Sequence, residues 1–222
     1  MEPTVSARDT AQPSTIEAIY NPNCRLCPLG KNVHNACIAS ASAPIDKTVD
    51  QLFVLQSPTK REDLDGSLAI PVLLAEIVYS VPDFVDVGNI YTRRISWAIT
   101  YAVKCFSRTG EPSLTEAEAC RKYLSQELLT YRPKCVIAFG NTALKSLTGT
   151  SGVSKLRGKV LKLRATLQSE LKPYSPVVFA TWLPSYVERE PARKADLLED
   201  MNRALRYIHN DGRTDDVPYE LL

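Results

Sequence analysis

The segment CVIAFGNTALKSL, residues 135–147, decides the fold of this chain. Its first six residues form an apolar run of the length and character of a buried strand. The seven residues after it have a helical pattern, so we expect the strand to pass directly into a helix. An apolar strand followed at once by a helix is typical of a parallel sheet that is covered on both faces.

The same alternation recurs on both sides of this segment. We expect further strands at residues 51–58, 95–105, 159–163 and 176–182, and helices at 68–79, 113–132 and 191–208. The helix expected at 113–132 opens with a capping box, Ser113-Leu-Thr-Glu116. The pattern predicts the α/β class, with three α/β/α layers around a mostly parallel sheet. A ligand crevice is then expected beyond the carboxyl ends of the strands, after Val54, Val103, Phe139 and Thr181.

Composition limits the class of protein. The 222 residues are 44% hydrophobic and 23% charged, which excludes a wholly disordered, collagen-like or membrane-spanning chain.

The sequence pattern predicts a flexible arm at residues 1–18, one domain at 19–210 and a polar tail at 211–222. The arm lacks the basic-then-apolar pattern of a secretory signal, so we expect a cytoplasmic, reducing location. Because the net charge is only +2, a nucleic-acid partner requires a local basic patch.

Cysteine is the most informative residue type. Cys24 and Cys27 form a Cys-x-x-Cys pair among turn formers, Cys105 ends a predicted strand, and Cys120 lies in the first turns of the next helix. In a reducing compartment this pattern predicts metal or cluster ligation, or redox chemistry. Four thiolates suit tetrahedral zinc or an iron–sulfur cluster, and the spacing leaves both open. Cys135 is expected in the core, and the segment around Cys37 is also compatible with a strand edge.

Several motifs follow one another in the order of a known family. They are Cys24-Arg-Leu-Cys-Pro-Leu, VLQSPTKREDLDG at residues 54–66, ITYAVKC at 99–105, Glu118-Ala-Cys120, RPKCVIAFGNTALKSLTG at 132–149, Leu156-Arg-Gly158 and LPSYVEREPARK at 183–194. Over residues 22–208 the chain resembles the family-4 uracil-DNA glycosylases. The resemblance implies their fold. It also implies a [4Fe–4S] cluster held by Cys24, Cys27, Cys105 and Cys120, which favours iron over zinc.

The pocket positions of that family carry different residues here. Its first motif, Gly-Glu-Ala-Pro-Gly, matches residues 55–59, so Gln56 replaces a carboxylate implicated in water activation. Tyr101 stands for the asparagine that reads the uracil edge, and Leu183 for the histidine beside the developing oxyanion. Ala69 stands for the aromatic side chain that stacks on the flipped base. Since loss of one such group costs roughly 10²- to 10³-fold in rate, we expect weak or lost uracil excision.

The loop after the first of these strands also carries acidic residues. We expect Glu62, Asp63 and Asp65 to lie in an exposed turn. Glu62 matches a second acidic position of the family's first loop. It is therefore the remaining candidate for polarising a water molecule.

Basic side chains in loops at the same sheet edge predict a DNA-binding surface. The resemblance implies that the cluster loop and a Pro-Ser loop contact the DNA backbone. The candidates are Arg25, Lys31, Lys60, Arg61, Arg157, Lys159 and Ser185. Each can donate to a phosphate oxygen without reading sequence. We expect salt-dependent binding of single- or double-stranded DNA with weak sequence preference.

Together these patterns predict an iron–sulfur, uracil-DNA-glycosylase-like protein that binds DNA. We expect weak or lost uracil excision and an accessory role in DNA metabolism or in a larger nucleic-acid assembly. One alternative is an active glycosylase for a different or modified base, with Gln56 and Tyr101 reshaping the pocket. The other is a structural zinc protein.

Overall fold

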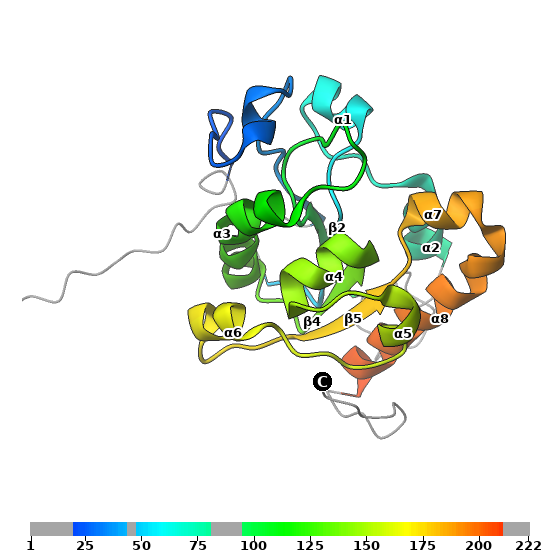
Figure 1. The fold of residues 1–222 in the computed structure, drawn as a ribbon. Coiled ribbons are helices and arrows are strands. Elements are labelled where there is room, and N and C mark those ends of the chain that lie inside the picture. Colours follow the sequence, from blue (N-terminus) through cyan, green and yellow to red (C-terminus); the bar gives the residue numbers. More distant parts are fainter. Residues whose placement is uncertain (1–19, 44–47, 81–94, 211–222) are drawn as a thin grey trace, which may run out of the picture.

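A five-stranded sheet runs through the centre of the computed structural model, which describes residues 20–43, 48–80 and 95–210 (Figure 1). The strands are β1 (Ala41–Ala43), β2 (Gln51–Leu55), β3 (Trp97–Tyr101), β4 (Cys135–Phe139) and β5 (Val177–Thr181). Their order in the sheet is β1-β3-β2-β4-β5. The arm expected at residues 1–18 and the tail expected at 211–222 lie outside the described residues.

The four longer strands are parallel, and β1 joins β3 antiparallel at one edge. Phe53 of β2 lies beside Ile99 of β3 and Ile137 of β4. Every residue of β2, β3 and β4 is buried, as expected of strands covered on both faces. The predicted α/β class with a mostly parallel sheet is confirmed. Because β2 to β5 run in one direction, the loops that follow them share one edge of the sheet.

Helices cover both faces of this sheet (Figure 1). The helical elements are η2 (Pro28–Lys31), α1 (Lys60–Asp65), α2 (Val72–Ser80), α3 (Leu114–Tyr131), α4 (Gly140–Thr148), α5 (Val153–Leu156), α6 (Ala165–Leu171), α7 (Pro184–Arg189), η3 (Pro191–Arg193) and α8 (Lys194–His209). Apolar residues of α2, α7 and α8 pack on one face. Those of α3, α4, α5 and α6 pack on the other. The three predicted layers are therefore present.

Helix α3 begins where the sequence predicts. The Ser113 side chain accepts a hydrogen bond from the Glu116 amide, and Glu116 Oε2 accepts one from the Ser113 amide at 2.7 Å. The helix ends at Arg132, whose left-handed backbone (φ 43°) precedes Pro133. Two predicted helices begin later than expected: α2 starts after Pro71, and a 3-10 turn at Pro191–Arg193 precedes α8.

Two expectations were wrong. Residues 60–65 form helix α1 instead of an exposed turn, because Thr59 and Glu62 make a second capping box and Gly66 ends the helix in the left-handed conformation. As a result Glu62 and Asp63 are buried, and only Asp65 remains exposed. Residues 159–163 form no strand; Leu161 makes a single antiparallel bridge to Val178, since helix α6 begins four residues later.

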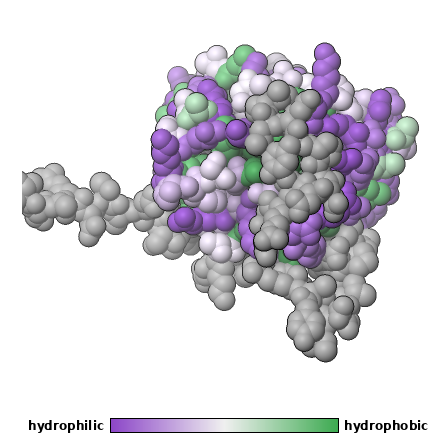
Figure 2. Space-filling model, turned by 90° about the horizontal axis from the view of Figure 1, so that it is seen from below, coloured by the Kyte–Doolittle hydropathy of each residue, from purple (hydrophilic) through white to green (hydrophobic). Residues whose placement is uncertain are grey.

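The surface agrees with an apolar interior. Hydrophilic side chains predominate over the described part of the face shown in Figure 2, and hydrophobic ones form small separate areas there. Among the described residues, no helix combines the length and the apolar character needed to cross a membrane.

Candidate functional site

A cavity of about 460 Å³ lies beyond the carboxyl ends of β2, β3 and β5. We call it the edge cavity. It brings together Gln56, Ala69, Tyr101 and Leu183, the four pocket positions expected from the sequence, and Ser185 also lines it. The parallel sheet explains most of this convergence, because Tyr101 ends β3 and Gln56 and Leu183 follow β2 and β5 at one edge. Ala69 reaches the cavity from the segment between α1 and α2.

Tyr101 and Glu62 form the inner wall of the edge cavity. The Tyr101 hydroxyl donates a hydrogen bond to Glu62 Oε1. That oxygen also accepts the Ala69 amide at 2.8 Å, and Oε2 accepts the amide and the hydroxyl of Thr59 at 2.7 and 2.8 Å. Burial, and then the bond to Glu62, raise the pKa of Tyr101 well above its usual range, so the hydroxyl remains a donor. Both carboxylate oxygens of Glu62 therefore accept hydrogen bonds, which hold the start of helix α1 and the backbone at Ala69 in place.

Gln56 and Leu183 form two other walls. Gln56 Nε2 donates to the carbonyl oxygen of Gly110 at 3.1 Å, which joins the loop after β2 to the loop after β3. Leu183 precedes α7 and packs on Gly140, where a Cβ atom would lie only 2.6 Å from Leu183 Cγ. Gly140 has φ +82°, so this close contact depends on glycine. Leu183 places an apolar surface where the resemblance implies a histidine donor.

The four cysteines expected as ligands converge on one buried site. Burial, and then the nearby Cys27 and Cys24 thiols, raise the pKa of Cys105 to about 11. The pKa of Cys120 is raised to about 12 by burial and by Cys105 and Cys27. All of these side chains are free thiols. We call Cys24, Cys27, Cys37, Cys105 and Cys120 the cysteine site.

Cys37 belongs to this site, whereas Cys135 does not. The Cys37 amide donates to Cys105 Sγ at 3.4 Å, and its left-handed backbone (φ 54°) lies before β1, which starts at Ala41. Burial raises the pKa of the Cys37 thiol. Cys135 starts β4 and lies in the core, as expected. Sequence spacing gave no means to assign Cys37, because its role depends on a neighbour 68 residues away.

The cysteine site contains thiols, the donor type that thiolate-bound metal groups use. Among the described residues, no three His, Cys, Asp or Glu side chains are placed so that they could hold a metal ion. Buried thiols nevertheless arrive there from three separate segments, and the Cys37 amide donates to Cys105 Sγ at 3.4 Å. Hydrogen bonds of this kind are common at the sulfurs of iron–sulfur clusters.

The loop that carries Cys24 and Cys27 is held tightly. Arg25 Nη1 donates to the carbonyl oxygens of Cys24 and Gly30 at 2.8 and 2.9 Å. A Cβ atom at Gly30 would lie 2.3 Å from the Cys24 oxygen, so the loop closes on itself only with glycine there. Asp63 of α1 accepts the amides of His34 and Asn35 at 3.2 and 3.0 Å. This contact links the cysteine loop to the wall of the edge cavity.

The candidate DNA-binding residues fall into two groups. Lys31, Lys60, Arg61 and Ser185 are exposed, with Lys60 and Arg61 in the first turn of α1 and Ser185 in the first turn of α7. Arg61 pairs with Asp65 at 3.4 Å on the surface. Arg25 is engaged within its own loop, as described above, and Lys159 is half-buried.

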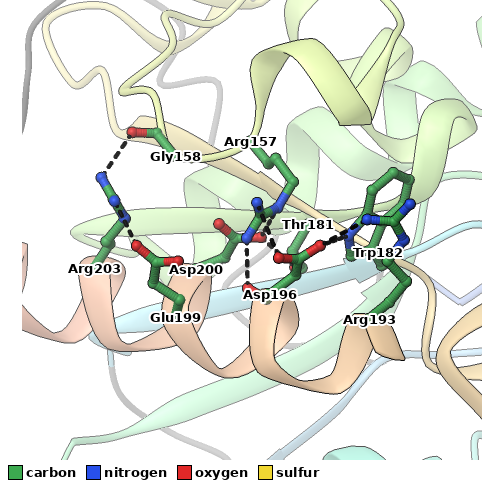
Figure 3. A network of polar contacts seen from close by, with 9 residues as sticks. All are labelled: Arg157, Gly158, Thr181, Trp182, Arg193, Asp196, Glu199, Asp200 and Arg203. Carbon is green, nitrogen blue, oxygen red and sulfur yellow. Dashed lines mark hydrogen bonds and ion pairs between the residues drawn. The ribbon is translucent and has the colours of Figure 1, made fainter. Parts of the chain in front are cut away.

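Arg157 lies in an internal polar network (Figure 3). Its Nε donates to Asp200 Oδ2 at 3.0 Å and its Nη2 to the Asp196 carbonyl oxygen at 2.9 Å. Thr181 donates to the same Asp200 oxygen at 2.9 Å, and Trp182 to Asp196 Oδ2 at 3.2 Å. The network therefore fixes the end of β5 against α8, directly before Leu183. Nothing in the spacing of the sequence indicates this role.

A larger cavity, of about 910 Å³, lies between the starts of α3 and α4. It contains none of the expected site residues. Its charges are largely paired, since Glu118 accepts Arg121 Nε and Arg164 Nη1, both at 2.8 Å. The edge cavity is therefore the better candidate site.

Comparison with known proteins agrees with this geometry. The family model described as "Uracil DNA glycosylase superfamily" matches residues 44–206. A Type-4 uracil-DNA glycosylase from Pyrobaculum aerophilum is 28% identical over 189 residues, which cover 81% of this chain and 86% of that protein.

Proposed function

Because this chain belongs to the uracil-DNA glycosylase superfamily, we propose that it is a DNA-binding member of the family with weak or no uracil excision. In this proposal the cysteine site holds an iron–sulfur cluster. The protein then serves as an accessory factor in DNA metabolism or in a larger nucleic-acid assembly. One observation carries the proposal: the residues that replace the family's catalytic groups are bonded to or packed on other parts of the protein.

None of these replacements supplies the expected chemistry. Gln56 is an amide, which does not act as a base at ordinary pH, and its Nε2 is engaged by Gly110. The Tyr101 hydroxyl donates to Glu62, so it does not offer the two hydrogen bonds with which an asparagine would bind the edge of uracil. Leu183 offers no donor for a developing oxyanion. Removal of several such groups together is expected to bring the rate close to that of the uncatalysed reaction.

The iron–sulfur part of the proposal is supported by the convergence of the cysteines and by the similarity to a Type-4 uracil-DNA glycosylase. Cys24, Cys27, Cys105 and Cys120 are the proposed ligands. A bound cluster would add its ligation energy to folding, since the proposed ligands join the N-terminal loop to the loop after β3 and to α3. Its role in this proposal is structural.

DNA binding is supported by exposed donors around the edge cavity. Lys60 and Arg61 begin the helix that carries Glu62, and Ser185 begins α7 beside Leu183. In this proposal these groups donate to DNA phosphates beside the edge cavity. We do not include Arg157 among the contacts, because Asp196 and Asp200 already engage its guanidinium.

Anaerobically purified protein tests the proposal. Anisotropy titrations with single- and double-stranded DNA at low salt are expected to show binding that weakens as salt rises. Iron analysis is expected to find a cluster, whereas stoichiometric zinc would support the alternative zinc protein. Absence of DNA association at low salt would contradict the binding function.

The alternative of an active glycosylase for another base has one observation in its favour. The edge cavity is open, and a glutamine side chain such as Gln56 can bind a base edge with two hydrogen bonds. Excision assays over uracil, hypoxanthine, xanthine and modified pyrimidines separate the two functions. Release of any base that is lost in Gln56→Ala would favour the enzyme.

A further inference from the structure

Helix α7 places one carboxylate at the edge cavity. Pro184, Ser185 and Glu188 line the cavity, and the spacing of three and four residues brings Glu188 onto the same side of the helix as the other two. Glu188 is exposed, and within the described residues its side chain makes no hydrogen bond or ion pair. Its carboxylate is therefore open to a group that enters the cavity.

The other ionisable side chains that line the cavity are already bonded. Both oxygens of Glu62 accept hydrogen bonds, and the Tyr101 hydroxyl donates one of them. The described residues that line the cavity include no lysine, arginine or histidine. Within this set, Glu188 is therefore the only charged side chain that no other part of the protein engages.

The uncharged polar side chains of the cavity fit donors and acceptors alike. Gln56 Nε2 uses one hydrogen on the carbonyl oxygen of Gly110 and keeps a second, and within the described residues its Oε1 accepts no hydrogen bond. The hydroxyls of Ser57 and Ser185 can also donate or accept. A carboxylate only accepts. Selection between ligands of similar shape therefore depends on Glu188.

We propose that the edge cavity receives an unpaired nucleobase with an exocyclic amino group, and that Glu188 selects this group against a carbonyl oxygen. The inference rests on the proposed DNA binding and names the ligand of the cavity. Cytosine carries an amino donor where uracil carries a carbonyl acceptor, and glutamate accepts from the cytosine amino group in known base contacts. The carbonyl oxygen of uracil would meet the carboxylate as a second acceptor and be repelled. Glu188 is in this sense a specificity-determining residue.

Two pairs of DNA duplexes test the proposal on anaerobically purified full-length protein. In each duplex one nucleotide lies opposite an abasic-site analogue, so it has no pairing partner to lose when it leaves the stack. One pair carries cytosine or uracil and the other adenine or hypoxanthine, so that the members of a pair differ in having an amino group or a carbonyl oxygen. Anisotropy titrations give the ratio of the two dissociation constants. We expect wild type to bind the amino member about tenfold more tightly in at least one pair, which also shows the size of base that fits.

Glu188→Gln is the test variant, because an amide both donates and accepts and is expected to lose most of this preference. Loss of one negative charge should strengthen binding of both members alike, so the ratio and not the affinity is the readout. A difference in stacking between two bases would persist in every variant. The matched control is Glu190→Gln, since Glu190 is the exposed C-cap residue of the same helix and lies outside the set that lines the cavity. It is expected to keep the wild-type ratio.

Equal binding of the two members in both pairs, or tighter binding of the carbonyl members, would overturn the inference and leave the proposed DNA binding intact. A preference that persists in Glu188→Gln would also overturn it, because another group would then make the selection. The same holds for a preference that is lost equally in Glu190→Gln, which would reflect the charge of the helix and not a contact in the cavity. Failure to bind any of the four duplexes at low salt would overturn the proposed DNA binding and this inference together.

Discussion

Tyr101 of β3 donates its hydroxyl to Glu62 of α1 across 39 residues of sequence, inside the edge cavity. The tyrosine stands where the resemblance implies an asparagine that reads uracil. Both partners are buried, and Glu62 is also bound by Thr59 and Ala69. The pair therefore uses two polar groups of the cavity wall to hold α1, which leaves them unavailable to a base.

The Tyr101–Glu62 bond should contribute to stability. Tyr101→Phe removes the hydroxyl but keeps the ring, so we expect a loss of about 1–2 kcal/mol in the free energy of unfolding. Urea unfolding measures this loss. An unchanged slope of the unfolding free energy against urea concentration would show that the variant and the wild type expose the same surface on unfolding. Tyr186→Phe is the control, because within the described residues the Tyr186 hydroxyl makes no hydrogen bond and its ring packs on Trp182. Equal stability of the two variants would show that the bond contributes nothing.

Ligation by cysteine should couple folding to iron content. Cys24→Ala and Cys120→Ala are expected to lower both soluble yield and iron content, because a structural cluster contributes its binding energy to folding. Cys135→Ala, in the core of β4, is expected to keep its iron. Cys37→Ala should also keep iron, because the backbone amide that donates to Cys105 Sγ remains in that variant. A Cys120→Ala protein with full iron content would contradict the ligand assignment.

DNA binding should depend on the first turn of α1. Lys60→Ala and Arg61→Ala are each expected to weaken binding equally for different sequences and to reduce the salt slope by about 1. Lys172→Ala is the control, because Lys172 follows α6, at the opposite end of the molecule from α1 (Figure 1). The measurement is anisotropy over a series of salt concentrations. A slope that falls equally in Lys172→Ala would indicate nonspecific attraction instead of a defined surface.

Asp200 should make stability depend on pH. Burial raises its pKa to about 6 in spite of the hydrogen bonds from Thr181 and Arg157, whereas an unfolded aspartate titrates near about 3.9. Between these values the folded protein binds the proton more tightly, so this contribution is present at low pH and is lost as pH rises through about 6. From about pH 5 to about pH 7 we expect wild type to lose about 1 kcal/mol more than Asp200→Asn.

Urea unfolding at several pH values tests this term. Asp65→Asn serves as the control, because Asp65 is exposed on α1 and pairs only weakly with Arg61. Parallel pH profiles for wild type and Asp200→Asn would contradict the assignment.

The sequence predicted the fold well because the deciding signals are local. The apolar runs of β2, β4 and β5 and the capping box at Ser113 each lie within a few residues. Thr59-Lys-Arg-Glu62 is also a capping box, but its helix has only six residues, so composition favoured a turn. The four pocket positions were predicted from the motifs of the family that the chain resembles, and Gln56, Tyr101 and Leu183 meet because parallel strands end at one edge of the sheet.

What the sequence did not predict depends on contacts between distant segments. The commitment of Arg157 to Asp196 and Asp200 requires α8 to lie beside the Leu156-Arg-Gly158 segment. The place of Cys37 beside Cys105 likewise depends on how the cysteine loop folds onto β3. Such pairings arise from tertiary packing, so the spacing of residues in a single sequence does not predict them.

Single-turnover release of uracil from single- and double-stranded DNA, with protein in excess, tests the central claim most directly. The account predicts that wild type binds the DNA and releases no uracil above background. The combined variant Gln56→Glu/Tyr101→Asn/Leu183→His, which restores the family's groups, is predicted to gain at least about 10²-fold, the effect of one such group. Wild-type release that disappears in Gln56→Ala would contradict the account, because it would show that the edge cavity remains a working active site.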